Sequence, residues 1–559
     1  MTRYRCSAGN CKMNVFSFIN IALLALFNFE LILCSKCGVD KLHIMPKAIN
    51  ITQSAKKTSA SKAVSYTPIS IGYDFSNLEK PSSMGSSTFE NVKSILKETR
   101  VEFSKILQVQ HENIDLSSYL RQIKDVCQID IIGDDYKNFL IKNDLIIFPK
   151  FDDLGNEVLA AAAPCITNND FRPIAGILYL NSKLNFGVKN TNLYMKNLLL
   201  HEISHILGFH PYFFTVLEMS SVEGSMSYIT SKKVRDKARE HFGCTTLSGI
   251  PLENQGGEGS VGSHWESRHM LGDYMISTDY PEQAISDITL ALFEDTGFYK
   301  VNYYSGGLFK FGKNKGCSFI NKKCVINEVP SFDEFCVNKD EPKCGSSRTV
   351  KSRCYITEYS NIPSQYQYFS DKSLGGFFAA DYCPVPLLYE SSNDYYPNHC
   401  QVGKKNSSYA YGETIGNDSL CFMSSLIQDS STNSADSKIP VCYKVSCDTN
   451  NNQIIITIGD KQVKCPKGGN SNFAPDGFKG SIECPKYEDV CSSNDGLVCN
   501  EMFSCLTELS SKNNYNYETS YYDSDDTVMD YIQPIKINGR FNLEINLISL
   551  IVGIILLVC

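Results

Sequence analysis

The chain has 559 residues, which is too long for one hydrophobic core and predicts two or three domains. Its 42% hydrophobic and 20% charged residues are typical of a globular protein and exclude collagen-like and wholly disordered chains. A formal net charge of -8 gives no overall attraction to phosphate and argues against nucleic acid as a partner. The 23 cysteines lack the recurring short paired spacings of zinc-binding motifs, so we expect disulfides formed in an oxidising compartment.

The N-terminal residues have the pattern of a secretory signal. Arg3, Arg5 and Lys12 precede an apolar run over residues 15–27, and a small-residue exit follows at 34–35. The run is too short and too interrupted for a transmembrane helix of about 20 residues, which is the alternative. We therefore expect a signal peptide over residues 1–34, with Met1 or Met13 as the first residue.

The C-terminal residues resemble the cleaved signal for a glycosylphosphatidylinositol (GPI) anchor. Residues 547–559 are nearly all apolar and end at the terminus with no basic flank, and we assign residues 541–559 to this hydrophobic tail. A short tail anchor is the alternative. Residues 506–540 are polar and acidic, which predicts a flexible stalk.

Between the two ends, the composition changes twice along the chain. Residues 35–63 are polar and basic, which suits a pro-segment. Alternating or continuous apolar residues predict strands over 68–74, 144–149 and 174–180. Only three cysteines lie between the pro-segment and residue 310, whereas 15 lie from Cys317 to Cys505. We therefore expect an ordinary hydrophobic core before residue 310 and a disulfide-stapled, loop-rich unit over 311–505.

Histidines are concentrated in one part of the chain. Six of the nine fall within 69 residues: His201, His205, His210, His241, His264 and His269. The first two lie in a segment, 192–209, whose apolar residues follow a helical pattern. Residues four apart share one face of a helix, so His201 and His205 can present two imidazole nitrogens to one ion, and Glu202 can reach a water on it. This H-E-x-x-H pattern is typical of zinc hydrolases.

A catalytic zinc ion takes three protein ligands and leaves a fourth position for water. Many enzymes with this helix have a glycine three residues after the second histidine and a third histidine three residues later. Gly208 is present here, but the expected histidine position holds Pro211. His210, one residue early, or a later histidine must then supply the third ligand.

Several blocks further along the chain carry a family resemblance. Besides H-E-x-x-H they are Ala163-Pro164-Cys165, Pro173 to Gly176, His241 to Cys244, Pro251 to Gly257, Gly262-Ser263-His264-Trp265-Glu266, Asp273-Tyr274-Met275 and Leu290 to Phe298. With these blocks the chain resembles the leishmanolysin-type metzincins, which are surface zinc endopeptidases. The resemblance makes His201, His205 and His264 the zinc ligands, Glu202 the catalytic acid/base, and Met275 the residue of the Met-turn beneath the metal.

The resemblance also implies a fold and a domain organisation. We expect an α+β protein with a metzincin-type catalytic region, followed by a cysteine-rich, disulfide-stapled C-terminal domain made mainly of strands and loops. The catalytic region would consist of an N-terminal unit with the zinc helix, over 64–211, and an inserted central unit with the third ligand and the Met-turn, over 212–310. The C-terminal domain would extend over 311–505.

The function implied is a zinc-dependent endopeptidase with one Zn²⁺ per chain and with proteins or peptides as substrates. It would be found in the secretory pathway, at the cell surface through a lipid anchor or outside the cell, with a role in protein degradation and in cell adhesion. The alternative is a catalytically inactive adhesion or binding protein on the same scaffold. The intact set of site residues favours the enzyme.

Other residues carry further expectations. Cys37 resembles the pro-segment cysteine of the family, whose thiolate could occupy the fourth zinc position and keep the enzyme latent; the alternative is a cysteine without metal contact. Setting aside Cys37 and the cysteines of the predicted signal and tail leaves 18, from Cys127 to Cys505, enough for nine disulfides. Three N-x-S/T sequences are glycosylation candidates, at Asn50, Asn406 and Asn417.

Overall fold

The computed structural model describes most of the region between the predicted signal and the predicted stalk. The described residues are 36–37, 42, 44–49, 65–111, 119–130, 143–156, 158–183, 191–257, 259–278, 280, 282–303, 309–388, 398–401, 412–430, 437–491, 516–518 and 533–535. The predicted signal peptide and hydrophobic tail lie outside them. Among the described residues, none of the helices combines the length and the hydrophobicity of a membrane-spanning segment.

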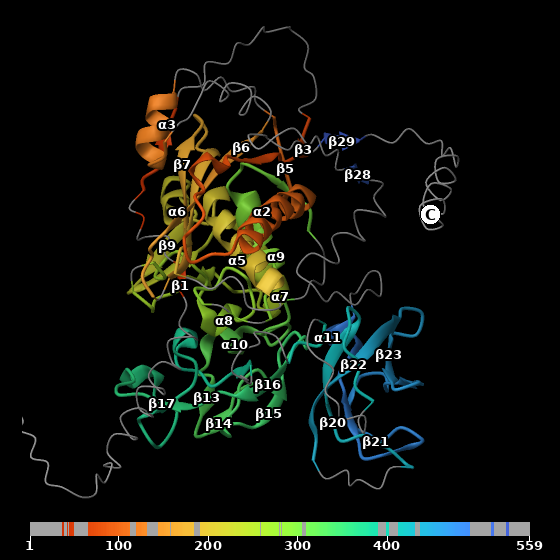
Figure 1. The fold of residues 1–559 in the computed structure, drawn as a ribbon. Coiled ribbons are helices and arrows are strands. Elements are labelled where there is room, and N and C mark those ends of the chain that lie inside the picture. The colour runs from red at the N-terminus through yellow and green to blue at the C-terminus, as the bar shows by residue number, and fades with distance from the viewer. Residues whose placement is uncertain are drawn as a thin grey trace, which may run out of the picture.

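A six-stranded sheet is the framework of the N-terminal half (Figure 1). Its strands lie in the order β1-β7-β8-β6-β4, and β2 also pairs with β7. Only the pairing of β7 with β8 is antiparallel; all the others are parallel. The strands are β1 (Lys36–Cys37), β2 (Lys47–Ala48), β4 (Ile71–Tyr73), β6 (Leu145–Asp152), β7 (Val158–Thr167) and β8 (Pro173–Asn181).

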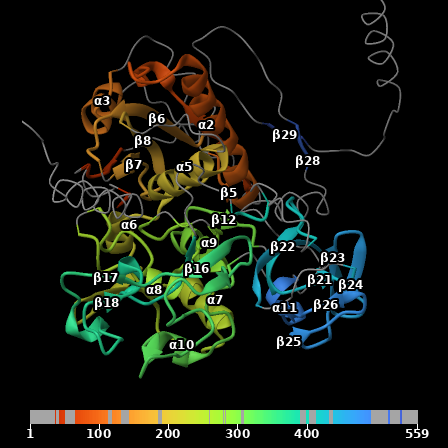
Figure 2. The same ribbon diagram turned by 60° about the horizontal axis from the view of Figure 1, so that its bottom comes forward.

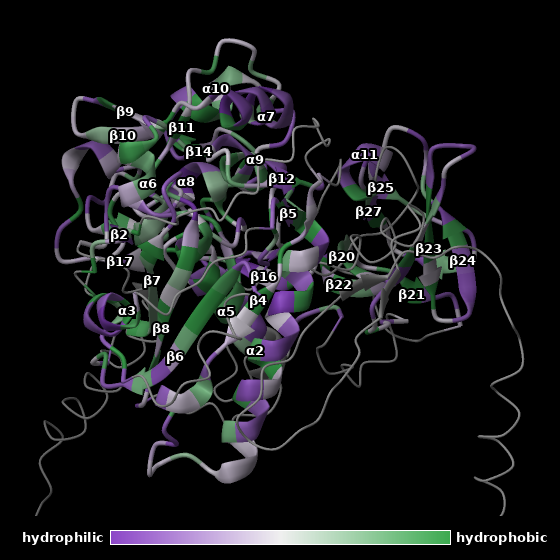
Figure 3. Cartoon of the chain, turned by 90° about the horizontal axis from the view of Figure 1, so that it is seen from above, coloured by the Kyte–Doolittle hydropathy of each residue, from purple (hydrophilic) through white to green (hydrophobic). Residues whose placement is uncertain are grey.

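The sheet separates two hydrophobic cores, because successive side chains of a strand point to opposite faces. Leu145 and Ile147 of β6 belong to the core on one face, whereas Ile146 and Phe148 belong to the core on the other. Every residue of β7 and β8 is buried, as expected for strands covered on both faces. Figure 3 shows the hydrophobic residues along β6 and β8.

Helices cover both faces of the sheet. The amphipathic α2 (Ser86–Ile106) buries residues such as Phe89, Val92, Leu96 and Phe103 at helical spacing and packs against α5 (Thr191–Leu207). On the other face, α3 (Leu120–Cys127) packs against β7 and β8, and its last residue is disulfide-bonded to β7. The sheet and α2 together therefore hold α5 in a fixed place.

The predicted strands over 144–149 and 174–180 are confirmed as β6 and β8. The predicted strand over 68–74 is instead divided between two sheets. Its first part belongs to β3 (Thr67–Pro68), which pairs with β5 (Leu107–Val109) and, through it, with β12 (Lys300–Val301). Its second part is β4, at the edge of the main sheet. This three-stranded sheet therefore connects the N-terminal unit to residues 300–301.

After α5 the chain forms short helices and a small sheet, β11-β10-β9. These elements are α6 (Pro211–Val216), β9 (Ser220–Glu223), β10 (Met226–Ile229), α7 (Lys232–Phe242), β11 (Ile250–Pro251), α8 (Ser267–Met270) and α9 (Asp287–Asp295). Their buried side chains join those of α2 and α5 in one hydrophobic cluster, which extends from Ile69 to Leu387. The first part of the cysteine-rich region therefore packs into the same core as the central unit.

That first part of the cysteine-rich region consists of short elements. They are α10 (Cys317–Asn321), β13 (Val325–Ile326), β14 (Val329–Pro330), β15 (Pro342–Cys344), β16 (Lys351–Cys354), β17 (Thr357–Glu358), β18 (Leu374–Gly375) and β19 (Pro386–Leu388). Single 3-10 turns lie at Phe75–Asn77, Ser364–Tyr366 and Phe378–Ala380.

A second six-stranded sheet, β24-β23-β22-β20-β27-β25, forms a body of its own at the side of the rest (Figures 1 and 2). It has a separate hydrophobic core, from Leu420 to Cys491. The sheet consists of β20 (Ser419–Ser424), β22 (Ile439–Asp448), β23 (Gln453–Ile458), β24 (Lys461–Lys464), β25 (Asn470–Phe473) and β27 (Ile482–Cys484). The same body contains the strand pair β21 (Ile427–Gln428) and β26 (Phe478–Lys479) and the helix α11 (Tyr487–Val490). In the predicted stalk, β28 (Asn516–Glu518) pairs with β29 (Gln533–Ile535).

Sixteen of the 18 cysteines expected to form disulfides are paired, and the other two, Cys499 and Cys505, lie outside the described residues. Cys244–Cys317 crosses the predicted boundary near residue 310, and Cys344–Cys421 connects β15 to β20. The other pairs are Cys127–Cys165, Cys324–Cys383, Cys336–Cys354, Cys400–Cys442, Cys447–Cys491 and Cys465–Cys484. Eight disulfides therefore join the described parts of the chain.

Candidate metal centre

The helix that carries the H-E-x-x-H motif packs directly against the sheet. Gly176 in β8 faces Ile206 of α5, and a Cβ atom on Gly176 would lie 2.3 Å from Cγ2 of Ile206. Real Cβ atoms essentially never come this close, so any larger residue here would force Ile206 or the helix to move. Gly176 belongs to one of the blocks that carried the family resemblance, and the contact gives a physical reason for a glycine there.

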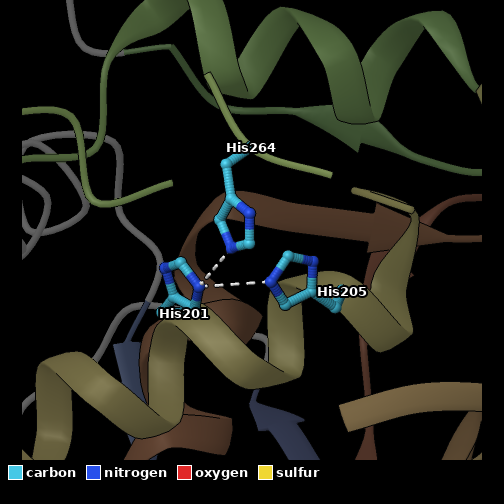
Figure 4. A group of neighbouring side chains, drawn as sticks. All are labelled: His201, His205 and His264. Atoms are coloured by element: carbon cyan, nitrogen blue, oxygen red, sulfur yellow. Dashed lines mark hydrogen bonds between the residues drawn. The ribbon is translucent and has the colours of Figure 1, made fainter. Parts of the chain in front are cut away.

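The rings of His201, His205 and His264 converge on one point, as Figure 4 shows. The first two come from successive turns of α5, and the third comes from the loop before α8. Nε2 of His201 lies 3.1 Å from Nε2 of His205 and 3.2 Å from Nε2 of His264. Among the described residues this is the group of histidine, cysteine and acidic side chains close enough to hold a metal ion.

These distances suit a zinc ion. Zinc binds imidazole nitrogen at about 2.0–2.1 Å, and tetrahedral geometry then places two nitrogens about 3.3 Å apart. Three imidazoles with one side left for a fourth ligand match the donor set of catalytic zinc sites. The residues present therefore fit a zinc ion.

The other ring nitrogen of each histidine faces a hydrogen-bond acceptor. Nδ1 of His201 lies 2.6 Å from the carbonyl oxygen of Tyr274, and Nδ1 of His205 lies 2.7 Å from that of Phe209. Nδ1 of His264 lies 3.1 Å from the carbonyl oxygen of Ser260. A carbonyl can only accept, so each Nδ1 carries the proton and each Nε2 keeps its lone pair for the shared point.

Burial keeps these imidazoles neutral. It lowers the pKa of His201 to about 4, and the bond to the Tyr274 carbonyl opposes this as the smaller effect. The pKa values of His205 and His264 are lowered well below the ordinary value by the same loss of solvent, with a smaller contribution from the neighbouring rings. All three are therefore unprotonated at neutral pH, which is the state in which imidazole binds metal.

Glu202 and Met275, the other predicted site residues near the histidines, are both fully buried. Glu202 is the residue after His201 on α5. Met275 lies in a turn held by two hydrogen bonds of its backbone: its N–H donates to Asp273 Oδ1, and its carbonyl accepts from the N–H of Trp265. The preceding residue of the same turn supplies the carbonyl that faces His201, so this turn touches the metal centre.

The remaining histidines of the group of six lie outside the metal centre. His210 caps α6, because its Nδ1 accepts from the N–H of Tyr212. Nε2 of His241 faces the carbonyl oxygen of Phe311, and Nε2 of His269 faces that of Ile320. The structure thus brings His264, rather than His210, to His201 and His205.

Sequence reasoning missed the groups that orient the three ligands. Three are the carbonyls of Tyr274, Phe209 and Ser260, and backbone carbonyls leave no signal in a sequence. Ser263, whose Oγ lies 2.9 Å from Nδ1 of His264, adjoins the ligand and could have been suspected from that alone. Thr289 accepts a hydrogen bond from Trp265 Nε1 and donates one to Asp273. It is 16 residues from the turn that it supports, so it could not have been suspected from the sequence.

The structure gives limited information on the other predicted sites. Cys37 lies in β1, opposite Ala160 of β7, at the edge of the main sheet. Asn417 is exposed in the turn before β20, which suits a glycosylation site. Asn50 and Asn406 lie outside the described residues.

A helix that presents two histidines to a third one from a distant loop, with a buried glutamate beside the first, defines a three-histidine metal centre of the metallopeptidase type. The sequence model of peptidase family M8, leishmanolysin, matches residues 91–496. This is most of the chain, and the chain therefore belongs to the leishmanolysin family.

Curated relatives agree with this assignment. The chain is 29% identical to the leishmanolysin homolog of Crithidia fasciculata over 60% of its own length and 53% of that protein. It is 28% identical to leishmanolysin of Leishmania major over 60% of this chain and 58% of the relative, and 27% identical to that of Leishmania chagasi over 67% and 66%. The chain thus spans between about half and two thirds of the length of these relatives.

Proposed function

We propose that this chain is a zinc-dependent endopeptidase with one zinc ion per chain, held by His201, His205 and His264. The observation that carries the proposal is the convergence of three neutral Nε2 atoms, 3.1 and 3.2 Å apart, each backed by an acceptor at Nδ1. Membership of a peptidase family supports the same reading.

A zinc ion at this point would polarise the carbonyl of a peptide bond and lower the pKa of a bound water to about 7. Neutral imidazoles leave the positive charge of such an ion uncompensated. The carboxylate of Glu202 takes the proton of the attacking water and then donates it to the nitrogen of the leaving amine. No serine or cysteine nucleophile is needed, because water itself attacks.

The proposal includes a place of action, at the cell surface or outside the cell. Eight disulfides suit a protein that matures in an oxidising compartment. A lipid anchor added near residue 540 would hold the enzyme at the membrane. Treatment of expressing cells with phosphatidylinositol-specific phospholipase C should then release it, and retention on the cells would count against this anchor.

Latency is a further part of the proposal, with Cys37 as the blocking group. Support comes from the position of the predicted pro-segment on the sheet. Its residues pair with both ends of the strand β7, at Val158 and at Thr167, and Ile44 and Ile49 are buried in the core beneath. The segment is thus bound to the catalytic unit rather than merely attached to it.

The function is tested by zinc analysis and proteolysis of the purified, processed chain. We expect about one zinc ion per chain and cleavage of casein that 1,10-phenanthroline abolishes. A chain that binds zinc but cleaves neither casein nor other unfolded proteins would support the adhesion alternative. A chain that binds no zinc would overturn the proposal.

A further inference from the structure

Tyr274 contacts the helix of the H-E-x-x-H motif at two points. Its carbonyl oxygen lies 2.6 Å from Nδ1 of His201, and its hydroxyl oxygen lies 2.6 Å from Oγ of Ser204. His201 and Ser204 are three residues apart on α5 and therefore share one face of the helix. A single residue of the turn thus touches the first histidine and the next helical turn.

The direction of the second contact follows from counting protons. Oγ of Ser204 also lies 2.8 Å from the carbonyl oxygen of Leu200, and a carbonyl can only accept. Ser204 has one hydroxyl proton, which this bond uses. The hydroxyl of Tyr274 must therefore donate to Ser204. The resulting chain of hydrogen bonds runs from Tyr274 through Ser204 to the backbone of α5.

Both side chains are completely buried, so water cannot replace either partner. The backbone of Tyr274 is held from the other side as well. Its N–H donates to the carbonyl of Ala284, and the side chain of Asp273 accepts from the N–H of Met275. The position of the Tyr274 carbonyl is therefore fixed relative to α5 by the hydroxyl bond, and on the other side by the bonds to Ala284 and to the Asp273 side chain.

We propose that the Tyr274–Ser204 hydrogen bond is a positioning device for the metal centre, which holds the Tyr274 carbonyl where it orients His201. Tyr274 and Ser204 are positioning residues, since the hydrogen bonds of their side chains run to each other and to the backbone of α5 and they act through His201. This inference rests on the proposed zinc site. Outer-shell groups that orient a ligand usually change metal affinity by about 10- to 100-fold when removed.

The test compares zinc affinities of the full chain and its variants by competition with a chromogenic chelator. Tyr274→Phe removes only the hydroxyl and leaves the carbonyl, the ring and the Ser204–Leu200 bond in place. We expect zinc to bind about tenfold more weakly, at the lower end of the outer-shell range because the effect is transmitted through the backbone. The double variant Tyr274→Phe/Ser204→Ala removes the same contact and should bind zinc as the single variant does.

A matched control exists in the C-terminal sheet. Tyr443 is also completely buried, and its hydroxyl lies 2.9 Å from Oγ of Ser424. Tyr443→Phe removes an equivalent tyrosine–serine bond in another hydrophobic core, so it should lower thermal stability to a similar extent and leave zinc affinity unchanged.

The outcomes separate this inference from the proposed function. Weaker zinc binding in Tyr274→Phe but not in Tyr443→Phe supports the positioning role. Zinc binding by the unmodified chain with equal affinity in Tyr274→Phe would overturn the positioning role alone. Failure of the unmodified chain to bind zinc would overturn the zinc site and the role together.

Discussion

The carbonyl oxygen of Phe209 lies 2.7 Å from Nδ1 of His205, one helical turn earlier in the chain. Gly208 makes this contact possible, because the chain leaves α5 there with a φ of 151°. A side chain at this position would be strained, and its Cβ would lie 3.2 Å from Cγ2 of Thr296. The glycine expected from the motif therefore serves to turn the chain back onto its own histidine.

Gly208→Ala should weaken zinc binding as well as stability. The strained backbone costs about 1–3 kcal/mol, and relief of that strain moves the Phe209 carbonyl away from His205. We expect about tenfold weaker zinc binding in chelator competition, by the outer-shell argument. Gly297→Ala is the control, since Gly297 also has a positive φ, of 76°, but is surrounded by open space. Equal zinc affinity in both variants would contradict this role for Gly208.

His264→Ala should impair zinc binding far more than His210→Ala. The first substitution removes one of three proposed ligands, so the loss should exceed the roughly 10- to 100-fold typical of outer-shell changes. The second removes a helix cap and should cost about 1 kcal/mol of stability without loss of zinc. Zinc content after dialysis distinguishes the two, and the opposite result would make His210 the third ligand.

Histidines outside the metal centre, among them His241, His269 and His399, predict a stability that falls in acid. Burial lowers the pKa of His241 and of His269 to about 3, and that of His399 to about 4. In the unfolded chain histidine titrates near 6.5, so between about pH 6.5 and 3–4 the unfolded state binds protons that the folded state does not. The contribution of these histidines to the free energy of unfolding is complete above about pH 6.5. As the pH falls below that value, each histidine lowers the free energy of unfolding by up to about 1.4 kcal/mol per pH unit.

Melting temperatures at pH 7, 6, 5 and 4 test this dependence. His241→Gln keeps a donor for the carbonyl of Phe311 and removes one titrating group. Its melting temperature should therefore fall less steeply with acid than that of the unmodified chain. Parallel pH profiles would show that His241 takes no part.

The latency proposal predicts the number of free thiols. Unfolded in the presence of a zinc chelator, the precursor should contain one reactive thiol per chain, that of Cys37, and the processed enzyme none. Cys37→Ser should give a precursor that cleaves casein before processing. If the Cys37→Ser precursor is as inactive as the unmodified precursor, Cys37 is not the blocking group, and other parts of the pro-segment block the site.

The sequence predicted those residues of the metal centre that lie close together along the chain. H-E-x-x-H places two histidines on one helix face by periodicity alone, and the structure has that helix at 191–207. The third histidine lies 59 residues after His205, and no spacing rule reaches so far; the resemblance to a known family indicated His264. The carbonyls that orient the ligands belong to the backbone and were not predictable.

The fold was predictable where apolar residues alternate or cluster, as in β6 and β8. The ten-residue strand β7 was missed because four successive alanines, at 160–163, carry no β-branched or aromatic signal. β7 is buried on both faces, and the packing of α5 against it favours small side chains. This packing is a property of the folded chain and is not visible in the local sequence. Disulfide partners were unpredictable for the same reason, since Cys244 and Cys317 are 73 residues apart.

The central claim, that Glu202 transfers the proton at a zinc site formed by three histidines, is tested most directly by Glu202→Gln. The amide has nearly the same shape but cannot take a proton from water. We expect the purified variant to retain one zinc ion per chain and to cleave casein about 10²- to 10⁴-fold more slowly than the unmodified enzyme. Undiminished cleavage by a zinc-loaded Glu202→Gln chain would contradict the account.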